Sequence, residues 1–531
     1  MGWKSKPELP DKRTWRLPIA LTTVFSCLEL VNILHHPMWR DELQVWMLAR
    51  HSHSIPELIW LKRYDGHPDA WFLIVYLITK ITSHPVWIQV VHALVATATA
   101  YLIARFSPFP RAAKVLIVFG YFFFFEYAVI SREYSLAVLG IFAFCAVFRP
   151  GLRKRYISLA LLLGLMCQGS VYGVMIALCL VLAMVFEAIR TPSWGQLIAR
   201  FRGRLAIAAA IFAISVCVSV LHMRPPSDGG YVTSLNFGIR GLMPSLSMFW
   251  VSFVPIPQFT RVFWNSNIIS DIIPIPLTAS RVAAFLGVMV FCASCLFFVR
   301  KRVVLLAYVC GAGALFVFKQ VVFHGYCYLR HDGFAFILFL ACLWLASGFP
   351  EEKFPLDGVE RLGNWFARFQ GWLLYAFLVV NVAGGLAASA AAFKIPFSQA
   401  RAAADFIREN KMDQWPIIGD RDFPVSSVAG YLGRDVYYVT GNRVGSFIIW
   451  DKRRLTTYAG PVMVLATRMA AERRHKVLVV LSYPADHFGQ GVSEVASFTG
   501  ASEIYENYYL YVVDSIPGLS TPPAVYGIVL P

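Results

Sequence analysis

Long apolar stretches separated by short polar segments recur along the chain from residue 19 to residue 391. Eleven of them predict membrane-spanning helices. We expect these spans at residues 19–34, 86–104, 113–130, 135–148, 156–166, 172–189, 205–221, 279–299, 303–322, 334–347 and 372–391. The hydrophobic pattern therefore predicts a polytopic α-helical membrane protein.

One apolar stretch, residues 69–82, is only about 14 residues long, too short for an ordinary crossing. If it crossed, the basic segment 105–114 would move outside, and the later basic loops would need another crossing that is not counted here. We therefore expect an interfacial or re-entrant helix within one large external loop, residues 37–85. Two further short helices are expected in this loop, near residues 43–50 and 56–62.

Composition and charge support a membrane protein. Of the 531 residues, 57% are hydrophobic and 15% are charged, whereas a soluble protein carries about a quarter charged residues. The net charge of +17 does not indicate nucleic-acid binding, because Lys and Arg cluster in short loops on one side. With the N-terminus in the cytoplasm, the basic cytoplasmic segments are 1–16, 105–114, 149–155, 190–204, 300–302 and 348–370.

Beyond residue 391 the pattern changes to alternating short helices and strands. Helices are predicted at 398–410 and 461–474, and strands at 416–418, 436–439, 447–450, 477–481 and 508–513. This alternation predicts a small α/β domain, residues 394–531, after a transmembrane domain, residues 1–393. The charge pattern puts the α/β domain outside, and without a phosphate loop or metal-ligand spacing its expected role is packing or acceptor positioning.

The same topology collects acids, bases and cations at the outer ends of the spans. They are Asp41, Glu42, His67, Asp69, Arg132, Glu133, Tyr134, Lys319, His324, Tyr328, Arg330, His331 and Asp332. A transporter more often places such groups near the membrane midplane. Their position at one surface favours chemistry at the membrane interface.

The acidic pair Asp41-Glu42 directly follows the first span, in the sequence His36-Pro37-Met38-Trp39-Arg40. A carboxylate at this position could deprotonate a hydroxyl group or hold a metal ion. Acids are also common at the start of a helix, where they act as caps. The residues alone leave both interpretations of the pair open.

The order of these features resembles the GT-C superfamily of membrane glycosyltransferases, which use polyprenyl-phosphate-linked sugars. The chain shares a basic N-terminus, one span, and an acidic pair opening a long external loop. Ser131-Arg132-Glu133-Tyr134 is similar to the Arg-x-Tyr element of the protein O-mannosyltransferase branch. Aminoarabinose transferases and oligosaccharyltransferases belong to the same superfamily.

This resemblance implies sugar transfer from a polyprenyl-phosphate donor to a hydroxyl group of a glycan, lipid or protein acceptor, with inversion. It implies a bacterial inner-membrane protein with a cytoplasmic N-terminus and a periplasmic or extracellular C-terminal domain. Asp41 is then the candidate general base, and Glu42 positions the acceptor or assists a metal.

The remaining candidates contact the substrates. Arg132, Arg330 and Lys319 are candidates for the donor phosphate, although cationic side chains at span ends also snorkel to the interface. Candidates for contact with sugar or acceptor are His67, Tyr134, Tyr328 and His331.

The chain departs from many superfamily members at residues 136–139, where a further Asp is expected and none is present. Glu133 could substitute for it. We therefore do not expect a tightly bound metal, while a divalent cation bridging Asp41 or Glu42 to the donor phosphate stays open. The alternative functions are a transporter or lipid-linked sugar flippase, and a non-catalytic scaffold.

Overall fold

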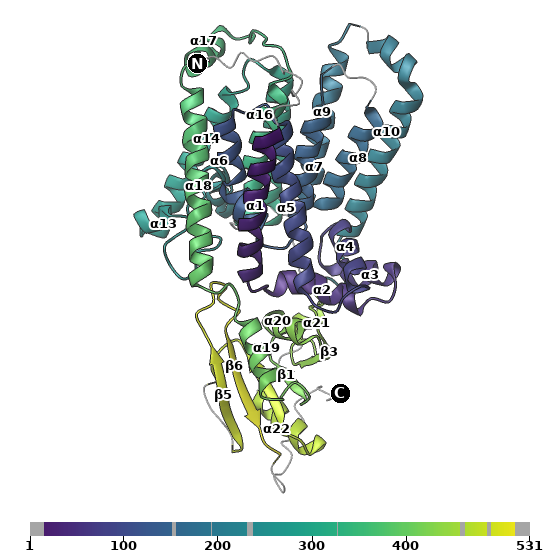
Figure 1. The fold of residues 1–531 in the computed structure, drawn as a ribbon, viewed down its shortest axis with the longest axis vertical. Helices are drawn as coiled ribbons and strands as arrows, with labels where there is room; N and C mark the ends of the chain where they lie inside the picture. The colour runs from purple at the N-terminus through teal and green to yellow at the C-terminus, as the bar shows by residue number, and fades with distance from the viewer. Residues whose placement is uncertain are drawn as a thin grey trace.

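The computed structural model describes residues 15–150, 155–192, 194–230, 237–325, 328–456, 462–485 and 490–515. Most of the basic N-terminal segment lies outside these ranges, as do residues 151–154 of the predicted basic segment 149–155. A helical bundle forms one part of the molecule and a small sheet domain the other (Figure 1). The predicted fold class is confirmed.

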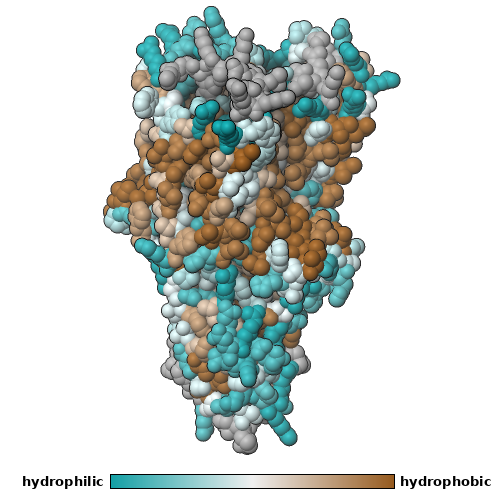
Figure 2. All heavy atoms as spheres, in the orientation of Figure 1, coloured by the Kyte–Doolittle hydropathy of each residue, from teal (hydrophilic) through white to brown (hydrophobic). Residues whose placement is uncertain are grey.

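Eight helices in the described ranges are long and apolar enough to cross a membrane. They are α1 (Arg16–His35), α5 (Val86–Phe106), α9 (Val171–Ile189), α10 (Trp194–Met223), α14 (Pro276–Leu296), α15 (Arg302–Val322), α16 (Leu329–Ala346) and α18 (Gln370–Lys394). Two shorter apolar helices, α7 (Tyr134–Val147) and α8 (Tyr156–Gly169), coincide with two more predicted spans. On the face shown in Figure 2, apolar side chains form a belt across the bundle, with polar surface on either side of it.

The span predicted at residues 113–130 is wrong as a continuous helix. Helix α6 (Arg111–Val118) has 8 residues, which is about 12 Å of rise against about 30 Å of hydrocarbon. A π-helical turn, η3 (Phe122–Glu126), follows it. Hydropathy missed the break because the residues stay apolar through it, while Gly385 of α18 lets the backbone of Tyr121 approach closely.

The predicted short helices of the first loop are confirmed. They are α2 (Arg40–His51), α3 (Ile55–Leu61) and the apolar α4 (Ala70–Thr79), with a 3-10 turn, η2 (Lys62–Tyr64), between the last two. All three helices lie at the end of the bundle that meets the sheet domain (Figure 1). Smaller helical elements elsewhere are η4 (Ile239–Gly241), α11 (Leu242–Leu246), α12 (Met248–Phe253), α13 (Ile269–Ile272) and α17 (Asp357–Phe366).

The sheet domain has six strands in the order β3-β2-β1-β4-β6-β5. Central strand β1 pairs in parallel with β2 and β4, and the remaining pairs are antiparallel. The strands are β1 (Ile417–Gly419), β2 (Val436–Tyr438), β3 (Arg443–Gly445), β4 (Val477–Leu481), β5 (Val492–Phe498) and β6 (Tyr508–Val513). The accompanying helices are α19 (Ala400–Glu409), α20 (Asp422–Leu432), α21 (Arg453–Thr456) and α22 (Val462–Arg473).

Two details of this domain differ from expectation. The strand predicted at residues 447–450 is absent, because the backbone of Ile448 bonds to the side chain of Gln44 on α2. Strands β3 and β5 and helices α20 and α21 were not predicted. Strand β5 lies at the sheet edge and is largely exposed, so it lacks the apolar signal of a buried strand.

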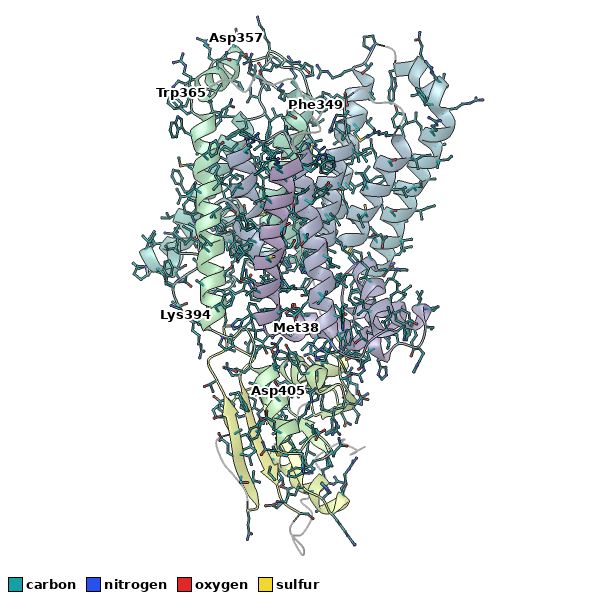
Figure 3. All side chains as sticks on the ribbon, viewed as in Figure 1. Met38, Phe349, Asp357, Trp365, Lys394 and Asp405 are labelled. Atoms are coloured by element: carbon teal, nitrogen blue, oxygen red, sulfur yellow. The ribbon has the colours of Figure 1, made fainter. Side chains whose placement is uncertain are left out.

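The ends of α1 and α18 meet the sheet domain together. Met38 and Lys394 lie at this end of the bundle, Asp405 lies within the sheet domain, and Asp357 and Trp365 lie at the opposite end (Figure 3). The chain just after Met38 is therefore enclosed between the bundle and the sheet domain.

Candidate active site

Asp41, at the start of α2, receives two guanidinium groups from distant parts of the chain. Its Oδ2 lies 3.1 Å from Nη1 of Arg132 and 3.3 Å from Nη1 of Arg330. Nε of the neighbouring Arg40 lies 3.6 Å from Oδ1. The side chain of Asp41 is still 20% exposed, so this carboxylate is open to an incoming molecule.

Burial alone would raise the pKa of Asp41. The positive charges of Arg132, Arg330 and Arg40 outweigh this effect, and the pKa is lowered from its usual value. Asp41 is therefore ionised at neutral pH and able to accept a proton or a hydrogen bond.

Glu42 has a different environment, although it is the next residue. It is fully buried, its Oε2 lies 2.8 Å from Nε2 of His36 and accepts from the amide of Trp39, and its Oε1 accepts from the amide of Ser131 at 2.7 Å. Glu42 thus caps the start of α2 by accepting from the N-cap amide of Trp39. Glu42 therefore holds the start of α2, and Asp41 is the member of the pair whose carboxylate is exposed.

Arg132 is held by several protein acceptors. Nε and Nη2 donate to the two oxygens of Glu133 at 2.9 and 3.2 Å, and Nη2 also donates to Nε2 of His67 at 2.9 Å. Nη1 donates to the Asp41 carbonyl oxygen at 3.1 Å and forms an ion pair with Oδ2 at 3.1 Å. Four hydrogen bonds to the protein therefore fix the guanidinium, and Arg132 is a clamp on Asp41.

His67 and Glu133 hold the guanidinium of Arg132 in place. Nε2 of His67 faces a guanidinium donor, so it must be the acceptor nitrogen, and the proton lies on Nδ1, which is 2.9 Å from Glu133 Oε1. Burial alone would raise the pKa of the fully buried Glu133, but Arg132 and His67 lower it well below its usual value. His67 therefore orients the guanidinium of Arg132 and the carboxylate of Glu133.

Arg330 has donors available. Its Nη1 is buried and has no hydrogen-bond partner within the described residues, only the ion pair with Asp41. Its guanidinium lies 5.1–5.5 Å from the ring centres of Trp39, Trp264 and Tyr328, a cation–π environment that holds it without using its N–H groups. Among the described residues, Arg330 thus keeps a buried N–H donor free of hydrogen bonds beside the carboxylate of Asp41.

Tyr134 and His331 extend the site towards the bundle. The hydroxyl of Tyr134 lies 3.1 Å from Nε2 of His331. Nδ1 of His331 is buried without a partner in the described part of the chain. The structure therefore brings Asp41, His67, Tyr134, Tyr328, Arg330 and His331 together from four segments.

Other predicted residues have partners of their own. Nζ of Lys319 lies 2.8 Å from both oxygens of Asp332 in a buried ion pair, so its charge is matched within the protein. Asp69 pairs with Lys62 at 2.8 Å and with His222. His324 is exposed.

Sequence reasoning missed the contribution of the sheet domain. Oε1 of Glu503 lies 3.7 Å from Nη1 of Arg40, and Oε1 of Glu506 accepts from the Arg40 amide at 3.3 Å. Burial raises the pKa of Glu506 to about 7. No motif or periodicity joins residues 40 and 506, so only the folded chain reveals this contact.

The residues do not fit a divalent cation. In the described ranges, no group of three or more His, Cys, Asp or Glu side chains is arranged to hold a metal ion. Asp41 faces two guanidinium groups, and Glu133 faces a guanidinium and an imidazole.

Comparison with known proteins gives similarity at the level of solved structures. No protein-family model and no curated protein matches the chain. The crystal structure of ArnT from Cupriavidus metallidurans bound to undecaprenyl phosphate is similar over 96% of this chain and 100% of that chain, with 12% identity and a TM-score of 0.48. ArnT in the apo state covers 93% of this chain and 97% of its own, with 12% identity and a TM-score of 0.47.

A third similar structure is the arabinosyltransferase EmbB from Mycobacterium smegmatis. It covers 76% of this chain and 45% of its own length, with 15% identity and a TM-score of 0.30.

Proposed function

We propose that this chain is a GT-C-type glycosyltransferase that moves a sugar from a polyprenyl-phosphate donor to an acceptor hydroxyl group at the outer face of a membrane. The single observation that carries the proposal is the pairing of Asp41 with Arg330. An ionised, partly exposed carboxylate lies 3.3 Å from a guanidinium that has unused donors. A base and an anion-binding group are thus adjacent where the apolar bundle ends.

In the proposed reaction, the acceptor oxygen attacks the anomeric carbon of the donor sugar. The bond from that carbon to the phosphate oxygen breaks, and its electron pair leaves with the polyprenyl phosphate. The hydroxyl proton passes to Asp41, which acts as general base. Inversion at the anomeric carbon is what the GT-C resemblance implies.

Arg330 stabilises the phosphate as it departs. A guanidinium forks two N–H groups onto phosphate oxygens, and the aromatic rings around Arg330 hold it in place during the exchange of partners. Arg132 keeps Asp41 in position throughout, because hydrogen bonds to Glu133, His67 and the Asp41 carbonyl fix its guanidinium.

Donor binding also strengthens the base. The pKa of Asp41 is low because Arg132, Arg330 and Arg40 surround it, although burial opposes them. A phosphate that shares Arg330 brings negative charge close to the carboxylate and raises its proton affinity. Asp41 therefore becomes a better proton acceptor when the donor is present.

The proposal extends to location and domain roles. Residues 1–393 are the catalytic membrane domain and residues 394–531 an extracytoplasmic domain. The basic loops opposite the site support a cytoplasmic N-terminus in a bacterial inner membrane. The acceptor is a glycan, lipid or protein with a free hydroxyl group.

The test uses purified protein in nanodiscs, with a panel of undecaprenyl-phosphate-linked radiolabelled pentoses and hexoses and a total membrane extract as acceptor source. Wild type is expected to transfer label, and Asp41→Asn to lose about 10²- to 10⁴-fold in rate. The matched control is Asp405→Asn, an exposed residue of the sheet domain, which retains full activity. Equal rates for wild type and Asp41→Asn would exclude Asp41 as the base.

The alternative, a transporter or lipid-linked sugar flippase, draws on one observation. Glu29 of α1 is fully buried in a membrane helix, and neither of its oxygens has a hydrogen-bond partner within the described residues. Buried membrane carboxylates often line transport paths. To test it, the protein is reconstituted into sealed vesicles with the same lipid composition as the nanodiscs. Movement of labelled donor across the vesicle membrane, with no transfer to any acceptor, would favour this alternative.

A further inference from the structure

Glu506 of the sheet domain is fully buried and has an unusual set of partners. Its Oε2 accepts from the hydroxyls of Ser398 and Tyr508, each at 2.7 Å, and its Oε1 accepts from Ser427 at 3.0 Å. These three donors belong to the same domain. A fourth donor, the backbone amide of Arg40, comes from the membrane domain at 3.3 Å.

That amide is one of the free donors at the start of α2. The first amides of a helix have no partner within it, and Trp39, at the N-cap, has no side-chain oxygen to accept from them. Glu42 satisfies the Trp39 amide, and Glu506 satisfies the Arg40 amide. A carboxylate beside a helix N-terminus also stabilises the helix dipole. The sheet domain thus caps the helix that carries Asp41 one residue later.

The side chain of Arg40 makes the same connection. Its guanidinium lies 5.3 Å from the ring centre of Phe423 on α20, 3.7 Å from Glu503, and 3.6 Å from Asp41. Residue 40 is therefore held by the sheet domain through both its backbone and its side chain.

A second contact lies one turn further along α2. Gln44 Nε2 donates to the carbonyl of Ile448 at 2.8 Å, and the amide of Ile448 donates to Gln44 Oε1 at 2.8 Å. Two contacts one turn apart fix both the position and the rotation of the helix. The rotation decides where the Asp41 carboxylate points.

We propose that Glu506 is a positioning residue for Asp41: it holds the first turn of α2, so that the sheet domain completes the active site. This inference rests on the proposed function and adds a role for residues outside the membrane domain. A displacement of about 1 Å in a reacting group can lower a rate by about 100-fold. Loss of the Glu506 contact therefore reduces turnover without removing any group that touches the donor.

The experiment separates the reach of the side chain from its charge. Glu506→Asp keeps the charge but is one methylene shorter, so it withdraws from the Arg40 amide. Glu506→Gln loses the charge but keeps an acceptor oxygen at full reach, and its amide group can donate to the neighbouring hydroxyls, which rotate. The matched controls are Glu409→Asp and Glu409→Gln, at an exposed residue that ends α19.

Each variant is measured for kcat and donor KM in the transfer assay, for Kd of undecaprenyl phosphate, and for hydrogen exchange of the amides of residues 40–44. Glu506→Asp is expected to raise exchange in α2 and to lower kcat by roughly tenfold or more, with KM and Kd within about twofold. Glu506→Gln is expected to stay within about threefold of wild type in kcat. The Glu409 variants match wild type throughout.

The inference would be overturned if Glu506→Asp had the same kcat and the same amide exchange in residues 40–44 as wild type. So would parallel losses of kcat, Kd and thermal stability in both Glu506 variants, because these indicate a general structural role. If wild type transfers no sugar at all, the proposed function fails separately, and the exchange of residues 40–44 then decides alone whether Glu506 holds α2.

Discussion

Arg132 binds Asp41 twice through one nitrogen: Nη1 lies 3.1 Å from the backbone carbonyl oxygen and 3.1 Å from Oδ2 of the carboxylate. A contact to both backbone and side chain of one residue restricts the carboxylate to a narrow set of rotamers. Because the other donors of Arg132 bind Glu133 and His67, the clamp is itself rigid. The base is thus held before any substrate binds.

Removal of the clamp is expected to affect stability and activity separately. Arg132→Met leaves the fully buried Glu133 without its guanidinium partner and should lower the free energy of unfolding by about 3–5 kcal/mol. Arg132→Met combined with Glu133→Gln removes the unpaired charge and should recover most of the stability, but not the transfer rate. Thermal unfolding in detergent checks the stabilities, and the transfer assay checks the rates. Wild-type stability of the Arg132→Met single variant would contradict the prediction.

Arg330 is expected to dominate donor binding. Hydrogen bonds to charged groups contribute about 1.5–3 kcal/mol, so Arg330→Ala should raise the Kd of undecaprenyl phosphate roughly 10- to 100-fold. Removal of the buried pair by Lys319→Met with Asp332→Asn should change this Kd by less than about threefold. Native mass spectrometry measures both constants, and the opposite ranking would assign the phosphate to Lys319.

Asp41 and Glu42 are expected to give opposite phenotypes. Glu42→Gln puts an NH₂ group where three donors now meet a carboxylate, and should lower the free energy of unfolding by about 1–3 kcal/mol. Asp41→Asn, at a partly exposed position, should cost less stability and far more activity. Melting temperatures and transfer rates of the two variants are compared directly, and a catalytic loss limited to Glu42→Gln would reverse the assignment.

Stability in acid is expected to depend on Glu133. Its pKa is well below the usual 4.5 because Arg132 and His67 outweigh the effect of burial. A lowered folded-state pKa contributes stability above the unfolded value, and this contribution is lost as the pH falls through the folded value. The melting temperature of wild type should therefore fall more steeply below about pH 4.5 than that of Glu133→Gln, and parallel curves would argue against a charged Glu133.

Metal chelation is expected to leave transfer unchanged. The carboxylates at the site face guanidinium and imidazole groups, which take the place that a cation would need. Transfer rates with and without excess EDTA should agree, measured alongside a zinc- or magnesium-dependent enzyme as a positive control. A loss restored by added magnesium or manganese would require a rearranged site in the donor complex.

The membrane architecture could be predicted because burial in lipid needs long apolar helices, and this requirement is visible in local sequence. Ten of the eleven predicted spans coincide with helices. The exception is the break at η3 (Phe122–Glu126), because hydropathy reports the polarity of residues and not the direction of the chain.

The candidate site could be predicted in part. Alternating topology put Asp41, His67, Arg132 and Arg330 at the same end of the bundle, and the structure brings them within contact of one another. Their division of roles could not be predicted. Whether Arg132 or Arg330 has donors to spare depends on partners such as Glu133 and the aromatic rings, and these are known only after folding.

The amino-acid sequence by itself therefore determined the class of protein, the order of its helices and the set of reactive side chains at one end, since each follows from local composition and charge. Only the tertiary structure decided that Asp41 is open while Glu42 is enclosed, and that Glu506 holds the helix carrying both. Hydrogen-bond satisfaction and burial depend on contacts between residues hundreds of positions apart, which local sequence does not encode.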